Sequence, residues 1–122
     1  MNSETLLLRQ ILPDFVQQGR PTSQAFRPTP KDENQLSVYD GARITAPASW
    51  HHYTERLNMK SAGVMALSCE ECAAEQLMII EDRVPFPEHC SIDFSGLKKS
   101  EVEKKSKKLA AYAKGRDWLF LP

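Results

Sequence analysis

Short hydrophobic runs recur along the chain at the length of β-strands. In 36–39 and 89–94, hydrophobic and polar residues alternate, which is typical of a strand with one buried face. Segments 6–12, 63–67 and 77–80 are hydrophobic at nearly every position, which also indicates strands, with a helical turn as the alternative for 6–12. We expect a small, mostly antiparallel sheet of these five segments, with 77–80 at its centre.

One helix is predicted near the middle of the chain. Trp50, Tyr53 and Leu57 are spaced as on one buried face of a helix. Thr45 can cap its first turn, a proline at position 47 is tolerated there, and the helix is expected to end near Asn58.

A second long helix is predicted over 101–114, and a shorter one begins at Ser68. Ser68 with Glu71 has the spacing of a capping box, and so has Ser100 with Glu103. Gly115 suits the left-handed position that follows a helix. The buried face of the long helix would carry Val102, Ser106, Leu109 and Ala113.

These elements predict one α+β domain over 1–122, with the two main helices on one face of the sheet. The chain has 122 residues, of which 41% are hydrophobic and 26% charged, a globular composition. The expected core is Trp50, Tyr53, Leu57, Val64, Leu67, Ile79, Ile92, Phe94, Val102 and Leu109.

Composition also limits where the protein works. No hydrophobic run approaches the roughly 20 residues that span a bilayer, and the first residues lack the basic start of a signal peptide. Three cysteines without an export signal fit a reducing compartment. We therefore expect a cytoplasmic protein with no membrane association.

The formal net charge is zero, with 16 basic and 16 acidic residues, which argues against a partner such as duplex DNA that would need a basic surface. Charge is nevertheless unevenly distributed: 70–93 is mostly acidic and 98–116 mostly basic. The two blocks could face each other, or one of them could face a partner.

Two motifs invite a metal or redox interpretation. Cys69 and Cys72 form a CxxC pair, which His89 and Cys90 could complete as a metal site. Two glutamates lie between the thiols and the capping box already explains the segment, so we expect no metal site. The adjacent pair His51–His52 cannot face one ligand, so we expect one solvated and one partly buried ring.

The last predicted helix offers a possible nucleic-acid surface. Lys104, Lys105 and Lys108 could contact phosphates, but no aromatic residue among the lysines could stack on bases. Glutamates four residues before Lys105 and Lys107 instead fit a solvated helix face. Weak binding through this helix stays an alternative.

The first half of the chain contains Arg9, then Gly19-Arg20, then 37–39, then the helix with Trp50 and Glu55. This order of residues resembles the start of RES-type toxins and other ADP-ribosyltransferase-like folds. The resemblance implies an NAD-consuming transferase in which Arg9 holds the phosphates, Tyr39 stacks on nicotinamide and Glu55 is the acid. The alternative is that these arginines pair with nearby aspartates.

Three further segments, 22–28, 36–41 and 85–89, resemble a group of small uncharacterised bacterial proteins. This resemblance implies a bacterial accessory protein, with no activity attached.

The function we expect is a non-enzymatic protein-binding module without a cofactor, and a toxin or defence operon is a setting that would encode it. Its contact residues would be Arg27, Lys31 and Asp32 beside a proline-rich loop, with Lys104, Lys105 and Lys108 on the last helix. NAD would be a cofactor only if Arg9, Tyr39 and Glu55 converge on one cleft.

Overall fold

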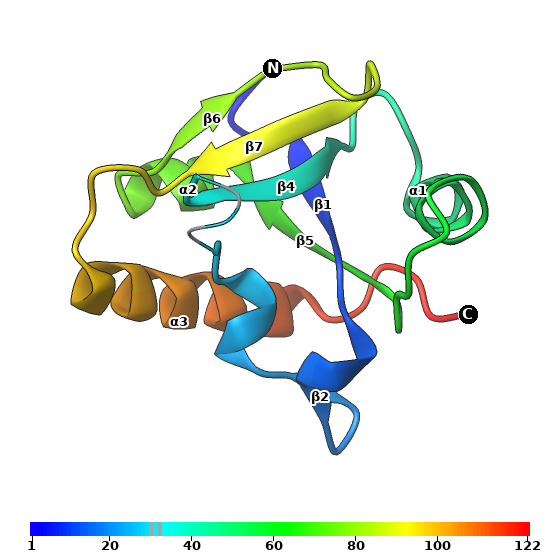
Figure 1. Ribbon diagram of the computed structural model, residues 1–122, viewed down its shortest axis with the longest axis horizontal. Helices are drawn as coiled ribbons and strands as arrows, with labels where there is room; N and C mark the ends of the chain where they lie inside the picture. Colours follow the sequence, from blue (N-terminus) through cyan, green and yellow to red (C-terminus); the bar gives the residue numbers. More distant parts are fainter. Residues whose placement is uncertain (30, 32) are drawn as a thin grey trace.

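A computed structural model describes residues 1–29, 31 and 33–122 and has an α+β fold built on a five-stranded sheet (Figure 1). The strand order is β5-β1-β4-β7-β6, and every neighbouring pair is antiparallel. The strands are β1 (Leu6–Gln10), β4 (Gln35–Asp40), β5 (Val64–Ser68), β6 (Met78–Ile80) and β7 (His89–Asp93). A separate short ribbon joins β2 (Val16–Gln17) to β3 (Arg20–Pro21). The predicted fold class and the mostly antiparallel sheet are confirmed.

The helices begin where side chains can cap them. α1 (Ala46–His51) is capped by Thr45, whose Oγ1 accepts from the nitrogen of Ala48 at 3.3 Å, and it continues into a wider π-helical turn, η4 (His52–Arg56). α2 (Cys69–Ala74) has the predicted capping box, with Ser68 and Glu71 bonded reciprocally at 3.0 and 2.8 Å. The 3₁₀ turns η1 (Pro13–Phe15) and η2 (Ser23–Phe26) lie between β1 and β4.

The last helix, α3 (Lys99–Arg116), begins earlier and ends later than predicted. The carboxylate of Glu101, rather than Glu103, accepts from the backbone nitrogen of Lys98 at 3.4 Å. Asp117, rather than Gly115, has the positive φ at the end of the helix, with φ at 71° and ψ at 177°. The capping pair at Ser100 and Glu103 is therefore wrong by two residues.

The two main helices cover opposite faces of the sheet, so the prediction that they share one face is wrong. Adjacent residues of β5 show this: Met65 and Leu67 pack in the cluster beneath α3, whereas Val64 and Ala66 pack with Trp50 of α1. Because the segment is hydrophobic at every position, both faces of the strand need cover. Figure 1 shows α3 beneath the sheet and α1 apart from it at the right.

Most of the predicted core is buried, namely Val64, Leu67, Ile92, Phe94, Val102 and Leu109. Trp50, Tyr53 and Ile79 are only partly buried. Leu57 is 39% exposed and lies just past the end of the helix, which widens at η4 and ends at Arg56. The predicted central position of 77–80 is also wrong: β6 is an edge strand that pairs only with β7 and leaves Met78 73% exposed.

The segment after α3 docks on the sheet. Phe120 forms an isolated bridge with Val64 at the edge of β5, and Trp118 donates its indole N–H to the carbonyl of Gly19 at 3.2 Å. Within the described part of the chain, no helix has the length and hydrophobicity needed to cross a membrane.

Leu109 provides a test of the α3 interface. It is fully buried against the sheet, so Leu109→Ala should lower the free energy of unfolding by about 3 kcal/mol through lost burial and the cavity left behind. Urea unfolding measures this change. Lys107→Ala, on the exposed side of the same helix, is the control and should change stability by less than about 0.5 kcal/mol. A loss below about 1 kcal/mol for Leu109→Ala would contradict the packing.

Glu71 should make stability depend on pH. Burial alone would raise the pKa of Glu71, but hydrogen bonds from Arg116 and the backbone of Ser68 outweigh it and hold the pKa below its usual value. Arg116 donates to both carboxylate oxygens, at 2.9 and 3.0 Å. This stabilisation is present above the unfolded pKa and is lost as pH falls through the folded one.

We therefore expect Glu71→Gln to cost about 1 kcal/mol at pH 7 and to flatten the decline of the unfolding free energy below about pH 5. Urea unfolding at a series of pH values measures both effects. Glu70→Gln, at the exposed neighbouring position, is the control and should leave the decline in place. The interpretation fails if the profile of Glu71→Gln matches that of the unchanged protein.

Candidate functional site

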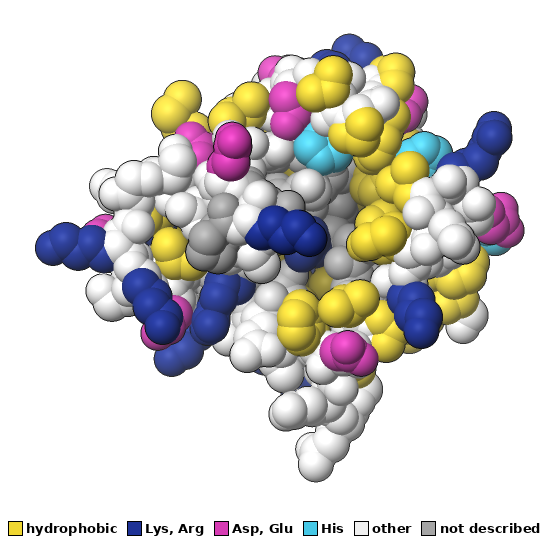
Figure 2. Space-filling model, viewed as in Figure 1, with side chains coloured by type: hydrophobic (Ala, Val, Ile, Leu, Met, Phe, Trp, Pro, Cys, Tyr) yellow, Lys and Arg dark blue, Asp and Glu magenta, His cyan; other side chains and the backbone are white. Residues whose placement is uncertain are grey.

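A cavity of about 400 Å³ opens on the α1 face of the sheet, between η4 and the 81–88 connection. Its floor comes from the strands, and its walls come from residues of η4, the turn after it and 85–86. The floor is Arg9, Gln10, Ser37, Val38, Tyr39 and His89, and the walls are Tyr53, Leu57, Met59, Pro85 and Phe86. Figure 2 shows hydrophobic and histidine side chains around a hollow on this face.

Aromatic rings organise one side of this cavity. Tyr39 stacks on Phe86 with ring centroids 5.0 Å apart and an angle of 29°. Phe86 in turn meets the rings of His52 and His89 edge-on, at 4.6 and 5.3 Å. Such offset and edge contacts are favourable arrangements of aromatic quadrupoles, so they hold Phe86 in a defined position as a flat wall.

The phenol of Tyr39 is hydrogen-bonded to Nδ1 of His52 at 2.7 Å. Burial raises the pKa of Tyr39 well above its usual range, and the nearby Tyr53 and Glu88 raise it further. Tyr39 therefore keeps its proton at neutral pH and serves as a neutral hydrogen-bonding group. Its partner His52 is partly buried while His51 is exposed, which is the arrangement predicted for the histidine pair.

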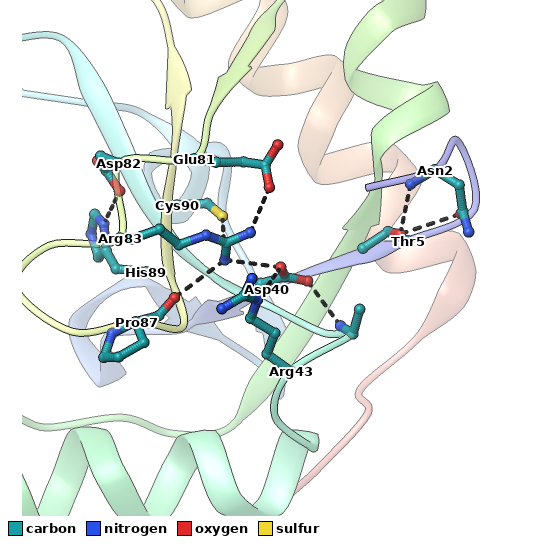
Figure 3. Close-up of polar contacts among 11 residues, drawn as sticks. Asn2, Thr5, Asp40, Arg43, Glu81, Asp82, Arg83, Pro87, His89 and Cys90 are labelled. Atoms are coloured by element: carbon teal, nitrogen blue, oxygen red, sulfur yellow. Dashed lines mark hydrogen bonds and ion pairs between the residues drawn. The ribbon is translucent and has the colours of Figure 1, made fainter.

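His89 is held by a carboxylate beneath the cavity. Its Nδ1 lies 2.7 Å from Oδ1 of Asp82, and the hydroxyl of Ser91 donates to the other oxygen, Oδ2, at 2.8 Å. A carboxylate at Nδ1 favours the tautomer with the proton on that nitrogen and leaves Nε2 as the acceptor. Figure 3 shows Asp82 directed at His89, whereas its neighbour Arg83 points the other way.

Arg83 ties the 81–88 connection to β4. Its guanidinium lies 2.9 Å from Oδ2 of the buried Asp40, and it also contacts Glu81 and donates to the carbonyl of Pro87 at 3.3 Å (Figure 3). The backbone nitrogen of Ala42 donates to the other Asp40 oxygen at 2.9 Å. This partly buried ion pair fixes the segment that carries Phe86, and the only sequence signal for it was a lone base in an acidic stretch.

Of the three residues expected to converge in a transferase, two meet. Arg9 and Tyr39 both line the cavity. The guanidinium of Arg9 donates to the carbonyls of Ala25 and Ser37, each at 2.9 Å. Glu55 is not part of the lining: its side chain is 69% exposed and lies 3.2 Å from Nδ1 of His51. The sequence did not single out His89 or Asp82 as the polar pair of this site.

The residues expected to contact a partner fall on separate surfaces. Arg27 lines a neighbouring cavity of about 280 Å³ that shares Arg9 and Ser37, and its buried Nε has no hydrogen-bond partner in the described part of the chain. Lys31 is exposed, and Asp32 lies outside the described residues.

On α3, Lys104 and Lys108 are exposed, whereas Lys105 donates to the carbonyl of Glu75 at 2.6 Å. Together with the pairing of Glu71 and Arg116, this contact shows that the acidic and basic blocks partly face each other where α2 meets α3.

All three cysteines are free thiols with raised pKa values. Burial raises the pKa of Cys72 to about 12 and that of Cys90 to about 11, and burial also raises the pKa of Cys69. The reactive form of a cysteine is the thiolate, so raised pKa values disfavour a redox pair. Among the described residues, no group of three or more histidine, cysteine or acidic side chains could hold a metal ion.

Thiol modification tests this environment. At pH 8 a thiol with a pKa of about 12 is ionised to only about 10⁻⁴, so Cys72 should react with iodoacetamide at least about 100-fold more slowly in the folded protein than in urea. Peptide mass spectrometry assigns the label to each cysteine. Cys69, which is less buried, should be labelled first, and Cys69→Ser provides the control. Rapid labelling of Cys72 in the folded protein would contradict the structure.

Comparisons with known proteins add no relative. The chain matches no protein-family model, and neither a curated protein nor a solved structure shows significant similarity to it. Both resemblances described from the sequence therefore stay predictions, and function must be argued from the geometry of the cavity.

Proposed function

We propose that this chain is a non-enzymatic protein-binding module, and that a partner inserts one large side chain into the cavity beside η4. The observation that supports this most directly is the combination of a cavity of about 400 Å³ with an exposed hydrophobic rim. Leu57 is 39% exposed and Met59 is 50% exposed, and both line the cavity.

Such a rim favours contact with another protein over a purely polar ligand. Exposed hydrophobic side chains gathered at one place mark interaction sites more often than isolated ones do. Val84, also exposed, precedes Pro85 of the cavity wall and extends the apolar surface. A partner side chain that enters the cavity would remove this surface from water and would be enclosed by aromatic walls, as the central residues of protein interfaces are.

The cavity suits this role better than the larger depressions elsewhere. One of these, of about 510 Å³, is lined by Glu71, Arg116 and Tyr112, whose polar groups are already bonded within the protein. The other, of about 590 Å³, is lined mostly by polar residues around Gln17 and Lys114. Neither gathers exposed hydrophobic residues at its rim.

The two alternatives have less support. An NAD-consuming transferase would need its acid in the cavity, and Glu55 lies outside it. Nucleic-acid binding through α3 would use Lys104, Lys105 and Lys108, one of which is engaged by Glu75. A cytoplasmic location and an accessory role in a bacterial operon remain predictions from the sequence.

Selection from a random peptide library displayed on phage tests the proposal. Peptides enriched on the unchanged protein should share a large hydrophobic or aromatic residue. Met59→Ala should weaken their binding at least about fivefold, because it removes part of the rim that the peptide covers. Isothermal titration calorimetry with the synthetic peptides gives the dissociation constants.

Met78→Ala is the matched control, since Met78 is at least as exposed but lies on the edge strand β6 rather than at the cavity. It should leave the affinity unchanged. The proposal fails if the library yields no enriched peptide, or if the enriched peptides respond to Met78→Ala and not to Met59→Ala.

A further inference from the structure

We propose that His89 selects the side chain inserted by the partner, and that this side chain is an aromatic ring with a hydrogen-bond donor at its far end, as in the phenol of tyrosine. This inference rests on the proposed function and adds the chemistry of the residue that is bound.

The buried polar side chains on the cavity floor differ in whether a polar atom is left without a hydrogen-bond partner among the described residues. Gln10 donates to Ser49 at 3.0 Å and accepts from Ser61 at 2.8 Å, and the phenol of Tyr39 bonds to His52. These groups are satisfied within the protein. His89 uses Nδ1 for Asp82, but its Nε2 has no partner among the described residues, although the residue is only 9% exposed. The floor thus presents one ring nitrogen that lines the cavity and can bond to a ligand.

Asp82 determines which kind of partner this nitrogen can take. Both of its carboxylate oxygens are in use, one toward Nδ1 of His89 and one accepting from Ser91. A neutral imidazole that gives its N–H to a carboxylate has only a lone pair at the other nitrogen. In this neutral form Nε2 accepts, so a matching ligand must donate. A carboxylate, an ether or a plain hydrocarbon would leave this acceptor unpaired.

The walls determine the shape of the ligand. Phe86 is held flat by its stack with Tyr39 and stands nearly perpendicular to the ring of His89, at 87°. A ring lying along Phe86 would direct its far end to the floor, while its aliphatic stem would meet Leu57 and Met59 at the rim. Tyrosine combines a hydrophobic body with a terminal donor, and it is enriched among the residues that dominate binding energy in protein interfaces.

Three small probes of nearly the same shape separate these requirements: p-cresol, its methyl ether 4-methylanisole, and toluene. The first donates a hydrogen bond, the second carries oxygen without a donor, and the third carries neither. Titration into the ¹⁵N-labelled protein, followed by amide shifts and the ¹⁵N shift of the His89 ring, gives dissociation constants and shows whether Nε2 is engaged. We expect p-cresol to bind about tenfold more tightly than the other two and to shift Nε2.

Variants extend the test. His89→Phe should remove the preference for p-cresol over toluene. His89→Gln, which keeps a neutral acceptor, should retain part of it and covers the case in which the phenylalanine variant fails to fold. Met78→Ala should leave the preference unchanged. In any tyrosine-containing peptide from the library, Tyr→Phe should weaken binding to the unchanged protein about tenfold and have little effect on His89→Phe.

The outcomes for the two proposals are distinct. Equal affinity for p-cresol and its methyl ether, or binding of p-cresol without a shift of Nε2, would overturn the role of His89 and leave the binding module standing. If none of the three probes binds while library peptides bind at the rim, the role of His89 is also overturned and the binding module stands. Failure of both the probes and the library would overturn the binding module itself.

Discussion

The five-stranded sheet has hydrophobic side chains on both faces, and this constraint determines the rest of the architecture. Met65 and Leu67 need cover on one side of β5, and Val64 and Ala66 need it on the other. The long α3 supplies one cover, together with residues of η2 and α2. On the opposite face α1 is short and η4 ends its coverage at Leu57, so part of the sheet stays uncovered. The cavity occupies this incompletely covered area.

The wall across from η4 depends on a different interaction, the ion pair of the buried Asp40 with the partly buried Arg83. The 81–88 connection has no regular secondary structure of its own, so its position must come from side-chain contacts. Arg83 supplies such contacts, because its guanidinium pairs with Asp40 of β4 and donates to the carbonyl of Pro87. The preceding residue, Asp82, contacts His89. Two consecutive residues thus hold the aromatic wall and orient the floor histidine.

The sequence allowed prediction of the features that depend on nearby residues. The capping box of Ser68 and Glu71 and the cap at Thr45 lie within a few residues of the helices they start, and both were correct. The extents of β4, β5 and β7 followed from hydrophobic patterning. The widening of the helix after His51 could not be predicted, because nothing in the local spacing of Tyr53 and Leu57 distinguishes a π-helical turn from an α-helix.

Prediction of the site was poorer for a physical reason. Tyr39 and Arg9 were singled out for a chemistry that also needed Glu55, and only tertiary structure could show that Glu55 faces away. His89 was considered only beside Cys90, as a metal ligand. Its partner Asp82 lies seven residues before it on an irregular connection, so their meeting depends on how that connection folds back onto the strand.

The order of the strands has a kinetic consequence. Leu7 pairs with Leu67 and Val38 with Cys90, so the central ladders join segments that are far apart in the sequence. Closing such long loops costs conformational entropy before the contacts can repay it, and proteins dominated by distant pairings fold slowly for their size. Until those ladders form, the newly made chain leaves its strands and its three thiols open to solvent, and the speed of closure governs how long that vulnerable interval lasts.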